Sequence, residues 1–427
     1  MLLSLSYNTA LFLYGLLHLP LWLWQCARHG KYRSSFLARL GFGLPMAPPD
    51  AKRVIWIHTI SVGETRAIIP LFERIKEEWP EAKIYISTIT ETGHAEAKRS
   101  LPGADGYFYL PLDFSPIIRR AINRLRPDLL ILAESDFWLE LLKGVRRRGG
   151  KTLLVNGKIS NRSERGFSRL RFFSRPLFAE LDKLCVQNDL YAERFHNVGI
   201  PDAKITITGN LKFDATQVAL SVEDKNRWRS KFKLASDDRL LAIGSTHEGE
   251  ERLILDQLEK LWAPLPKIKA FIAPRHPERF ESVARLLSDR GIPFARYSSI
   301  EEATGEEKVL LIDTIGLLPT LFQLAECAII GGSYLPGVGG HNIFEPIQAH
   351  IPVLFGPHME MQPDLTHLVL DAQAGIQSPP EQLEEILLNL LNDPNSQPLY
   401  RERAETLDKE ARGSADRSFA HLQNMLD

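Results

Sequence analysis

The 427-residue sequence is poor in several features that define a function by themselves. It holds three cysteines, Cys26, Cys185 and Cys327, without C-x-x-C spacing. They predict neither a disulfide framework nor a zinc site, and they favour a reducing compartment. The formal net charge is only −1, so no global attraction to nucleic acid or membrane is expected. The absence of G-x-G-x-x-G and Walker patterns argues against dehydrogenases and P-loop enzymes.

The segment 7–24 differs from the rest because it is almost uncharged and rich in leucine and aromatic residues. Arg28, Lys31 and Arg33 follow it. A bilayer span needs about 20 apolar residues, so its length is borderline. Charge that follows the apolar stretch is not typical of a cleaved signal peptide, and it favours the cytoplasmic side. The pattern indicates a membrane anchor with a basic flank, 1–45; the alternative is a buried helix of the globular body.

Short apolar runs alternate with amphipathic segments in the remaining chain. The alternation predicts an α/β fold of two Rossmann-like, doubly wound domains with parallel sheets. The expected strands are 54–57, 83–87, 129–133, 152–155 and 183–186, then 240–244, 270–273, 309–312, 327–330 and 353–355. The predicted divisions are a first domain at 46–214, a linker at 215–226, a second domain at 227–400 and a C-terminal helix at 401–427 that could cross back to the first domain.

A glycine-rich loop follows the expected strand 327–330, with five glycines between Gly331 and Gly340. Glycine lets a backbone turn sharply and approach a ligand closely. A helix expected from about Asn342 would present free N–H groups to this loop, which suits a phosphate. Glu345, in its first turn, could accept hydrogen bonds from ribose hydroxyls. The alternative is a tight turn with a helix-capping acid.

Polar clusters follow six of the expected strands. The clusters begin at Glu64, Glu134, Asn156, Ser245, Arg275 and Gly331. Ligands of parallel α/β sheets bind outside the carboxyl ends of the strands. We therefore expect both domains to face one shared cleft.

Six motifs in this order resemble one known family. They are His58-x-x-Ser61-Val62-Gly63-Glu64, Thr88-x-Thr90-x-Thr92-Gly93, Gly209-Asn210-Leu211-Lys212-Phe213-Asp214, Ser245-Thr246-His247-Glu248-Gly249-Glu250, Pro274-Arg275-His276-Pro277-Glu278-Arg279-Phe280 and Gly339-Gly340-His341-Asn342. Together they resemble the 3-deoxy-D-manno-octulosonic acid (Kdo) transferases over nearly the whole chain. The resemblance implies a GT-B glycosyltransferase that transfers Kdo from CMP-Kdo to a lipid A precursor. It also implies inversion, no metal or other cofactor, addition of one or several Kdo residues, and the cytoplasmic face of the inner membrane.

The resemblance implies that Glu64 is the general base, because the attacking hydroxyl must lose its proton. From spacing alone, Glu64 could equally be a helix N-terminal acid favoured by the dipole. The implied acceptor-binding and supporting residues are Ser61, Gly63, Thr90, Thr92, Glu134, Asp136, Asn156 and Lys158. The implied donor-binding residues are Lys212, Ser245, Thr246, Glu248, Arg275, His276, Gly331, Gly332, Gly339, Gly340, Asn342 and Glu345.

The sequence contains no Asp-x-Asp, the element with which GT-A enzymes hold a divalent ion. The CMP phosphate would then meet helix N-termini and cations such as Arg275, although a salt-bridged or solvated cation is the alternative. Glu134 and Asp136 could orient the acceptor or tune Glu64, or could cap the next helix. His247 and His341 lack metal-ligand spacing, so we expect them to form hydrogen bonds.

An arginine- and phenylalanine-rich region spans 146–175. It suits an anionic membrane surface or the phosphates of lipid A, and a plain solvated face is the alternative. Nucleic acid is not expected as a partner because no nucleic-acid motif accompanies the charge. Two rival functions stay open: a UDP-sugar transferase or epimerase of GT-B type, and a catalytically silent lipid-binding module.

Overall fold

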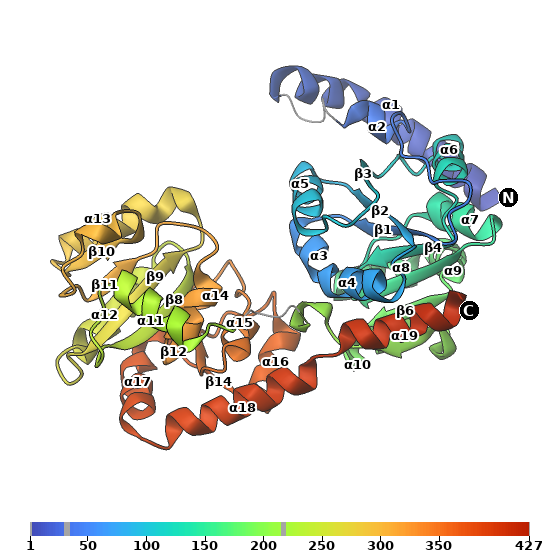
Figure 1. Ribbon diagram of the computed structural model, residues 1–427. Coiled ribbons are helices and arrows are strands. Elements are labelled where there is room, and N and C mark those ends of the chain that lie inside the picture. Colours follow the sequence, from blue (N-terminus) through green and yellow to red (C-terminus); the bar gives the residue numbers. More distant parts are fainter. Residues whose placement is uncertain (1, 30–34, 215–218, 427) are drawn as a thin grey trace. The chain divides into compact units, whose positions relative to one another are not determined.

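The computed structural model describes residues 2–29, 35–214 and 219–426. The chain divides into two compact units. Unit 1 consists of Met1–Ala215 with Ala411–Asp427, and unit 2 consists of Thr216–Glu410. Each unit holds one parallel sheet with helices on its faces (Figure 1). The prediction of two doubly wound α/β domains is therefore confirmed.

The sheet of unit 1 has the order β3-β2-β1-β4-β5-β6-β7. Its strands are β1 (Val54–Thr59), β2 (Lys83–Thr88), β3 (Gly106–Tyr109), β4 (Leu129–Ala133), β5 (Lys151–Gly157), β6 (Lys183–Val186) and β7 (Ile205–Ile207). Its helices are α1 (Leu2–His29), α2 (Phe36–Arg39), α3 (Val62–Ala67), α4 (Ile69–Glu78), α5 (Glu91–Ser100), α6 (Ser115–Leu125), α7 (Leu139–Arg147), α8 (Asn161–Arg169), α9 (Arg171–Ala179), α10 (Asp189–Asn197) and α19 (Ser414–Leu426).

Both faces of this sheet are buried, as a parallel sheet requires. Ile55 and Ile57 pack into a cluster with α4 and α19, whereas Trp56 packs on the opposite face with α6 and α7. Successive side chains of a strand point to opposite faces of the sheet. Because every residue of the run 54–57 is apolar, both faces are covered by helices. The parallel arrangement also brings the carboxyl ends of β1, β2, β4 and β5 to one edge.

The sheet of unit 2 has the order β10-β11-β9-β8-β12-β13-β14. Its strands are β8 (Arg239–Thr246), β9 (Ile268–Pro274), β10 (Phe294–Arg296), β11 (Val309–Leu311), β12 (Cys327–Ile330), β13 (Val353–Phe355) and β14 (Gly375–Gln377). Its helices are α11 (Val222–Lys231), α12 (Glu250–Leu261), α13 (Phe280–Asp289), α14 (Leu318–Leu324), α15 (Phe344–Gln348), α16 (Pro363–Asp371), α17 (Leu383–Asn392) and α18 (Ser396–Ala411). α12, α13 and α17 pack on one face with Leu241 and Ile243.

Two predicted boundaries were wrong. The second half of the linker 215–226 belongs to α11, which Ser221 caps by accepting a hydrogen bond from the Asp224 N–H; residues 215–218 lie outside the described residues. α11 has no fully buried residue, so its sequence shows no apolar period. The predicted helix 401–427 is two helices, because the chain turns at Gly413 (φ +87°). α19 then packs on α4 and β5 of unit 1.

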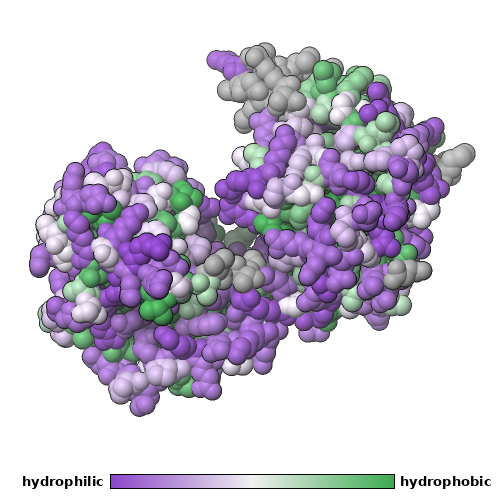
Figure 2. Space-filling model, viewed as in Figure 1, coloured by the Kyte–Doolittle hydropathy of each residue, from purple (hydrophilic) through white to green (hydrophobic). Residues whose placement is uncertain are grey.

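α1 is anchored to unit 1 near its start. The Tyr7 hydroxyl donates to Asp113 (2.9 Å), and the Asn8 side-chain amide donates to Ser115 (2.9 Å). Beyond these contacts, the large apolar side chains of Phe12, Leu13, Leu16 and Leu17 are exposed. Figure 2 shows apolar surface on the upper part of unit 1, where Figure 1 draws α1. The alternative of a buried helix is therefore wrong.

Among the residues that the structure describes, no helix is both long and apolar enough to cross a bilayer. The predicted anchor over 7–24 lies within α1 and stays a prediction.

Candidate functional site

Glu64 lies just beyond the carboxyl end of β1, in the first turn of α3. Ser61 caps this helix by accepting a hydrogen bond from the Glu64 N–H (3.4 Å), and the Glu64 carboxylate accepts one from the Ile60 N–H (2.7 Å). Gly63 is exposed, and a Cβ there would approach only the Ser61 hydroxyl, at 3.9 Å. No packing within the described structure therefore requires glycine at this position, which leaves open space beside Glu64.

The half-buried Glu64 carboxyl has a pKa raised to about 7. Burial is the largest cause, and the negative charges of Glu134 and Asp136 add to it; the Ile60 N–H and His58 act in the opposite direction. A carboxylate with a pKa near 7 can accept a proton at neutral pH more readily than an ordinary one. The predicted tuning of Glu64 by nearby like charge is supported.

Glu134 lies at the centre of a cluster of charged side chains at the carboxyl ends of β4 and β5. Its two carboxylate oxygens pair with Lys158 (2.8 Å) and Lys212 (3.0 Å). Burial raises the pKa of Glu134, but the two ammonium groups outweigh it and the pKa lies below its ordinary value. Glu134 (φ +59°) and the adjacent Asn156 (φ +54°) both adopt left-handed backbone conformations, an unusual strain that is often found at functional sites.

Two more of the predicted site residues belong to this cluster. Lys212, which was expected to bind the donor, lies in unit 1 and pairs with Glu134. Asn156 is buried, and its side chain accepts from the Leu211 N–H (3.1 Å) and approaches Glu134 (3.4 Å). Asn156 thus ties the segment that carries Lys212 to the Glu134 carboxylate.

Asp136 is positioned by a buried hydrogen-bond chain that the sequence did not reveal. One Asp136 oxygen receives both His58 Nε2 (2.7 Å) and Trp138 Nε1 (2.7 Å). The fully buried His58 ring contacts the Ser87 hydroxyl through Nδ1 (2.8 Å). His58 belongs to the first of the six motifs. The sequence feature that could have revealed its role is its position, since it is a polar residue directly after the apolar run 54–57.

Thr90 and Thr92 have local roles. Thr90 caps α5 by accepting from the Gly93 N–H (3.0 Å), and its hydroxyl donates to the Ile60 carbonyl (3.0 Å). Thr92 donates to Thr90 (3.4 Å). A Cβ at Gly93 would lie 2.8 Å from the Thr90 hydroxyl. This motif therefore fixes α5 against the loop that carries Glu64.

In unit 2, the glycine-rich loop after β12 is closed by a carboxylate whose role the sequence did not reveal. The fully buried Glu250 accepts hydrogen bonds from the N–H groups of Gly332, Ser333 and Tyr334 at 2.7–3.0 Å. It also accepts from the His247 N–H (2.8 Å). Glu250 therefore already occupies the amides of residues 332–334, at the start of this loop.

Crowding within the unit explains four of the five glycines of this loop; around Gly337 (φ +109°) there is open space. A Cβ at Gly331 would lie 2.6 Å from the Thr246 Cα, and one at Gly332 would lie 2.6 Å from His341. A Cβ at Gly339 (φ +84°) would likewise clash with Met361, and one at Gly340 (φ +89°) would clash with Met359. α15 begins at Phe344 rather than Asn342, whose side chain accepts from the Phe344 N–H and donates to Glu345.

Thr246 and Glu248, which were both expected to bind the donor, differ from each other in exposure. Thr246 is buried, and its hydroxyl donates to Glu251 (2.6 Å), which also pairs with both guanidinium ends of Arg279 (2.6 and 3.0 Å). Glu248 is exposed. Ser245 has φ +57° and marks the bend at the end of β8.

Three imidazoles gather at the ends of β8 and β9 and beside the loop. His247 Nε2 and His341 Nε2 are 2.7 Å apart, and the His276 ring meets that of His247 edge-on. Burial lowers the pKa of His341 to about 4 and also lowers that of His247, so the two neutral rings share one hydrogen bond. The prediction of hydrogen-bonding roles for both is confirmed. The side chains of Arg275 and His276 are exposed beside them.

In the described parts of the chain, no group of three or more His, Cys, Asp or Glu residues is arranged to hold a metal ion. The groups brought together are a charged cluster with Glu64 in unit 1 and an imidazole, arginine and glycine cluster in unit 2. A proton acceptor in the first and cationic and hydrogen-bonding groups in the second suit a group transfer with an anionic leaving group.

Comparison with known proteins identifies the family. Residues 34–215 match the family model described as "3-Deoxy-D-manno-octulosonic-acid transferase (kdotransferase)". The 3-deoxy-D-manno-octulosonic acid transferase of Chlamydia muridarum is 35% identical over 93% of this chain and 92% of its own length. That of Haemophilus influenzae is 30% identical over 93% of this chain and 92% of its own length.

Solved structures agree on the fold. The UDP-GlcNAc 2-epimerase from Neisseria meningitidis, solved with UDP-GlcNAc, matches 88% of this chain and 99% of its own with a TM-score of 0.61 and 15% identity. A likeness at this identity concerns the fold alone, which is that of GT-B proteins. The sequence matches go further: the chain belongs to the family of 3-deoxy-D-manno-octulosonic acid (Kdo) transferases and is a glycosyltransferase.

Proposed function

We propose that this enzyme transfers Kdo from CMP-Kdo to a lipid A precursor, lipid IVA, in lipopolysaccharide biosynthesis, with inversion at the anomeric carbon. One or several Kdo residues are added in succession. Family membership supports the transferred sugar. The donor and the acceptor are proposed from the resemblance of the motifs and from the chemistry of the two clusters.

The observation that carries the mechanism is the Glu64 carboxyl, half-buried beside two acids, with its pKa raised to about 7. In the proposed step, a hydroxyl oxygen of the acceptor bonds to the anomeric carbon while the bond from that carbon to the CMP phosphate oxygen breaks. The hydroxyl proton passes to Glu64, and CMP leaves with the bonding electrons. A single displacement of this kind inverts the anomeric centre.

Unit 2 supplies the groups proposed to hold the donor. The Arg275 guanidinium offers a planar set of donors for a phosphate, and His276 lies next to it in the sequence. The neutral His247–His341 pair adds hydrogen-bonding capacity without charge. These groups can stabilise the leaving phosphate in the way a divalent cation does elsewhere, so we propose a transfer independent of metal and cofactor.

We also propose that the enzyme acts at the cytoplasmic face of the inner membrane, held there by α1 and by the arginine-rich surface of unit 1. The exposed side chains of Phe12, Leu13, Leu16 and Leu17 support insertion of α1 into the interfacial region. A lipid acceptor would reach unit 1 from the same surface. A buffer of moderate ionic strength would weaken only the electrostatic part of this attachment.

The decisive test is incubation with CMP-Kdo and lipid IVA, followed by mass measurement of the product and quantification of released CMP. We expect one CMP for each Kdo added. A UDP-sugar enzyme of the same fold is the rival, and ligand-induced thermal stabilisation separates the two: CMP should raise Tm and UDP should not. Stabilisation by UDP alone, without CMP release in the assay, would overturn the proposal.

A further inference from the structure

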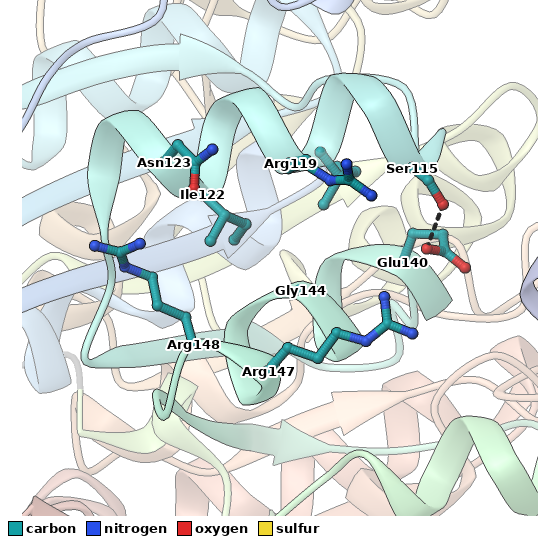
Figure 3. Close-up of a pocket in the computed structure, with 9 residues that line it drawn as sticks. Ser115, Arg119, Ile122, Asn123, Glu140, Gly144, Arg147 and Arg148 are labelled. Atoms are coloured by element: carbon teal, nitrogen blue, oxygen red, sulfur yellow. Dashed lines mark hydrogen bonds between the residues drawn. The ribbon is translucent and has the colours of Figure 1, made fainter. Parts of the chain in front are cut away.

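A groove of about 400 Å³ runs between α6 and α7 in unit 1, and its lining includes none of the residues of the Glu64 cluster (Figure 3). Its floor is apolar and includes Ile118, Ile122 and Gly144. A Cβ at Gly144 would lie only 3.2 Å from Ile122 and 3.3 Å from Ile118. The two helices therefore approach closely at the floor, and the rim above it is formed by longer polar side chains.

Three arginines form this rim. Arg119 comes from the middle of α6, and Arg147 and Arg148 come from the end of α7 (Figure 3). Within the described chain, none of their guanidinium groups has an ion pair or hydrogen bond. Asn123 adds an amide between them. Three cations around one groove repel one another unless an anion lies between them.

The neighbouring Arg146 shows that this lack of partners is specific to the groove. Arg146 points elsewhere, near Glu180 (3.7 Å) and Asp182 (3.6 Å), and it donates to the Ala179 carbonyl (2.7 Å). Partners for arginine are therefore available on this surface. Arg147 and Arg148, adjacent in the sequence, do not use them.

One end of the groove meets the start of α1. Ser115 lines the groove and receives the Asn8 side-chain amide of α1, and Lys143 of α7 donates to Ser4 (3.0 Å). Glu140, the one acid among the lining residues, is buried and accepts a hydrogen bond from Ser115 (2.6 Å). The exposed apolar side chains of α1 begin at Leu5. A cationic groove thus leads to an apolar surface.

We propose that this groove binds the phosphate of an anionic glycerophospholipid headgroup, with the acyl chains directed toward α1. Guanidinium groups bind phosphate oxygens through paired, charge-assisted hydrogen bonds. The Asn123 amide serves the glycerol hydroxyls of such a headgroup. The inference rests on the proposed membrane association but is independent of the donor, the acceptor and the role of Glu64.

The test is binding of the full chain to vesicles of phosphatidylcholine mixed with phosphatidylglycerol, measured by flotation without donor or acceptor. Arg119→Ala, Arg147→Ala and Arg148→Ala should each weaken binding about tenfold, as expected for a lost charge-assisted hydrogen bond. The matched control is Arg146→Ala, which removes the same charge from the same helix and should weaken binding by about twofold through screened attraction.

A second variant tests whether vesicle binding needs the space of the groove, independently of its charge. Asn123→Trp fills the space between the arginines without changing net charge, and it should weaken vesicle binding as Arg147→Ala does. Thermal melting establishes that each variant is folded. If Arg146→Ala and Arg147→Ala weaken binding equally and Asn123→Trp has no effect, the surface attracts lipid only through its overall charge and the inference is wrong.

Inorganic phosphate distinguishes a soluble ligand from a lipid. Calorimetric binding of phosphate that depends on Arg147, with vesicle affinity equal in all variants, would assign the groove to a free phosphate ester and overturn the lipid headgroup. Failure of the wild-type chain to bind any vesicle would remove both membrane association and this inference. A chain that binds vesicles yet transfers no Kdo would contradict the proposed function alone.

Discussion

Each unit places a glutamate soon after the first strand of its parallel sheet, and the two glutamates are surrounded in opposite ways. Glu64 follows β1, the third strand of its sheet order, and Glu250 follows β8, a central strand of the other sheet. Glu64 receives one backbone N–H and is half-buried beside two acids. Glu250 is fully buried and receives four backbone N–H groups.

This difference separates a reactive carboxylate from a structural one. A half-buried carboxylate beside other negative charges binds a proton more readily than an ordinary one. Unit 1 therefore has a group that can change its protonation state at neutral pH. Unit 2 instead uses Glu250 to shape the loop after β12.

The strongest test of the comparison is Glu64→Gln. The amide is nearly isosteric but cannot take a proton, so kcat should fall about 10³-fold, within the range for removal of a general base. The Tm should change little, because Glu64 makes one hydrogen bond with its carboxylate. Glu73→Gln, on the exposed face of α4, is the matched control and should retain full activity. Full activity in Glu64→Gln would reject the base assignment.

Glu250→Gln should produce the converse result, a loss of stability. The Gln side chain turns an NH₂ group toward amide N–H donors, so two buried donors lose their acceptor. We expect a cost of about 3 kcal/mol in the stability of unit 2, typical of a broken buried charged network. Faster hydrogen exchange at residues 332–334 would locate the effect, and Glu248→Gln, at an exposed neighbour, should leave it unchanged. Unaltered exchange in Glu250→Gln would refute the structural role.

Glu248 and Glu250 also show where the structure could be predicted from the sequence and where it could not. Glu248 and Glu250 stand in one motif, and only burial distinguishes the exposed residue from the one that closes the loop. The central strands were all predicted because burial on both faces demands continuous apolar runs. The four missed strands, β3, β7, β10 and β14, are the edges of the two sheets. Each is only three or four residues long and partly exposed, so it leaves no such run.

The candidate site was predictable to the level of residue type and strand end. Glu64, Glu134 and Asp136 meet because β1 and β4 are adjacent, which follows from a doubly wound sheet. The pairing of Lys212 with Glu134 was not predictable, because β7 lies at the far edge and only the turn after it brings Lys212 back. His58 was hidden for a similar reason: its partner Asp136 is 78 residues away in the chain.

A smaller effect is expected from Asp136→Asn, which tests the cause of the raised pKa of Glu64. Asp136→Asn removes a negative charge that raises the pKa of Glu64, so that pKa should fall. Activity of the wild type should decline as pH drops through about 7, where Glu64 becomes protonated. In Asp136→Asn this decline should move to lower pH by roughly half a unit, the size expected for one partly solvated charge. Asp202→Asn, an exposed acid near β7, should leave the profile in place; an unchanged profile in Asp136→Asn would show that Asp136 does not tune Glu64.

The smallest expected effect is that of metal removal, and it tests the other half of the comparison. If Arg275 and the neutral imidazoles of unit 2 stabilise the departing phosphate, treatment with EDTA should leave the initial rate of CMP release unchanged within about twofold. Arg275→Ala should then lower kcat, whereas Arg252→Ala, another arginine of unit 2, should not. A rate that collapses with EDTA and returns with magnesium would mean that a cation takes the place we assign to Arg275. The division between a proton-accepting unit and a phosphate-holding unit would then need a metal to complete it.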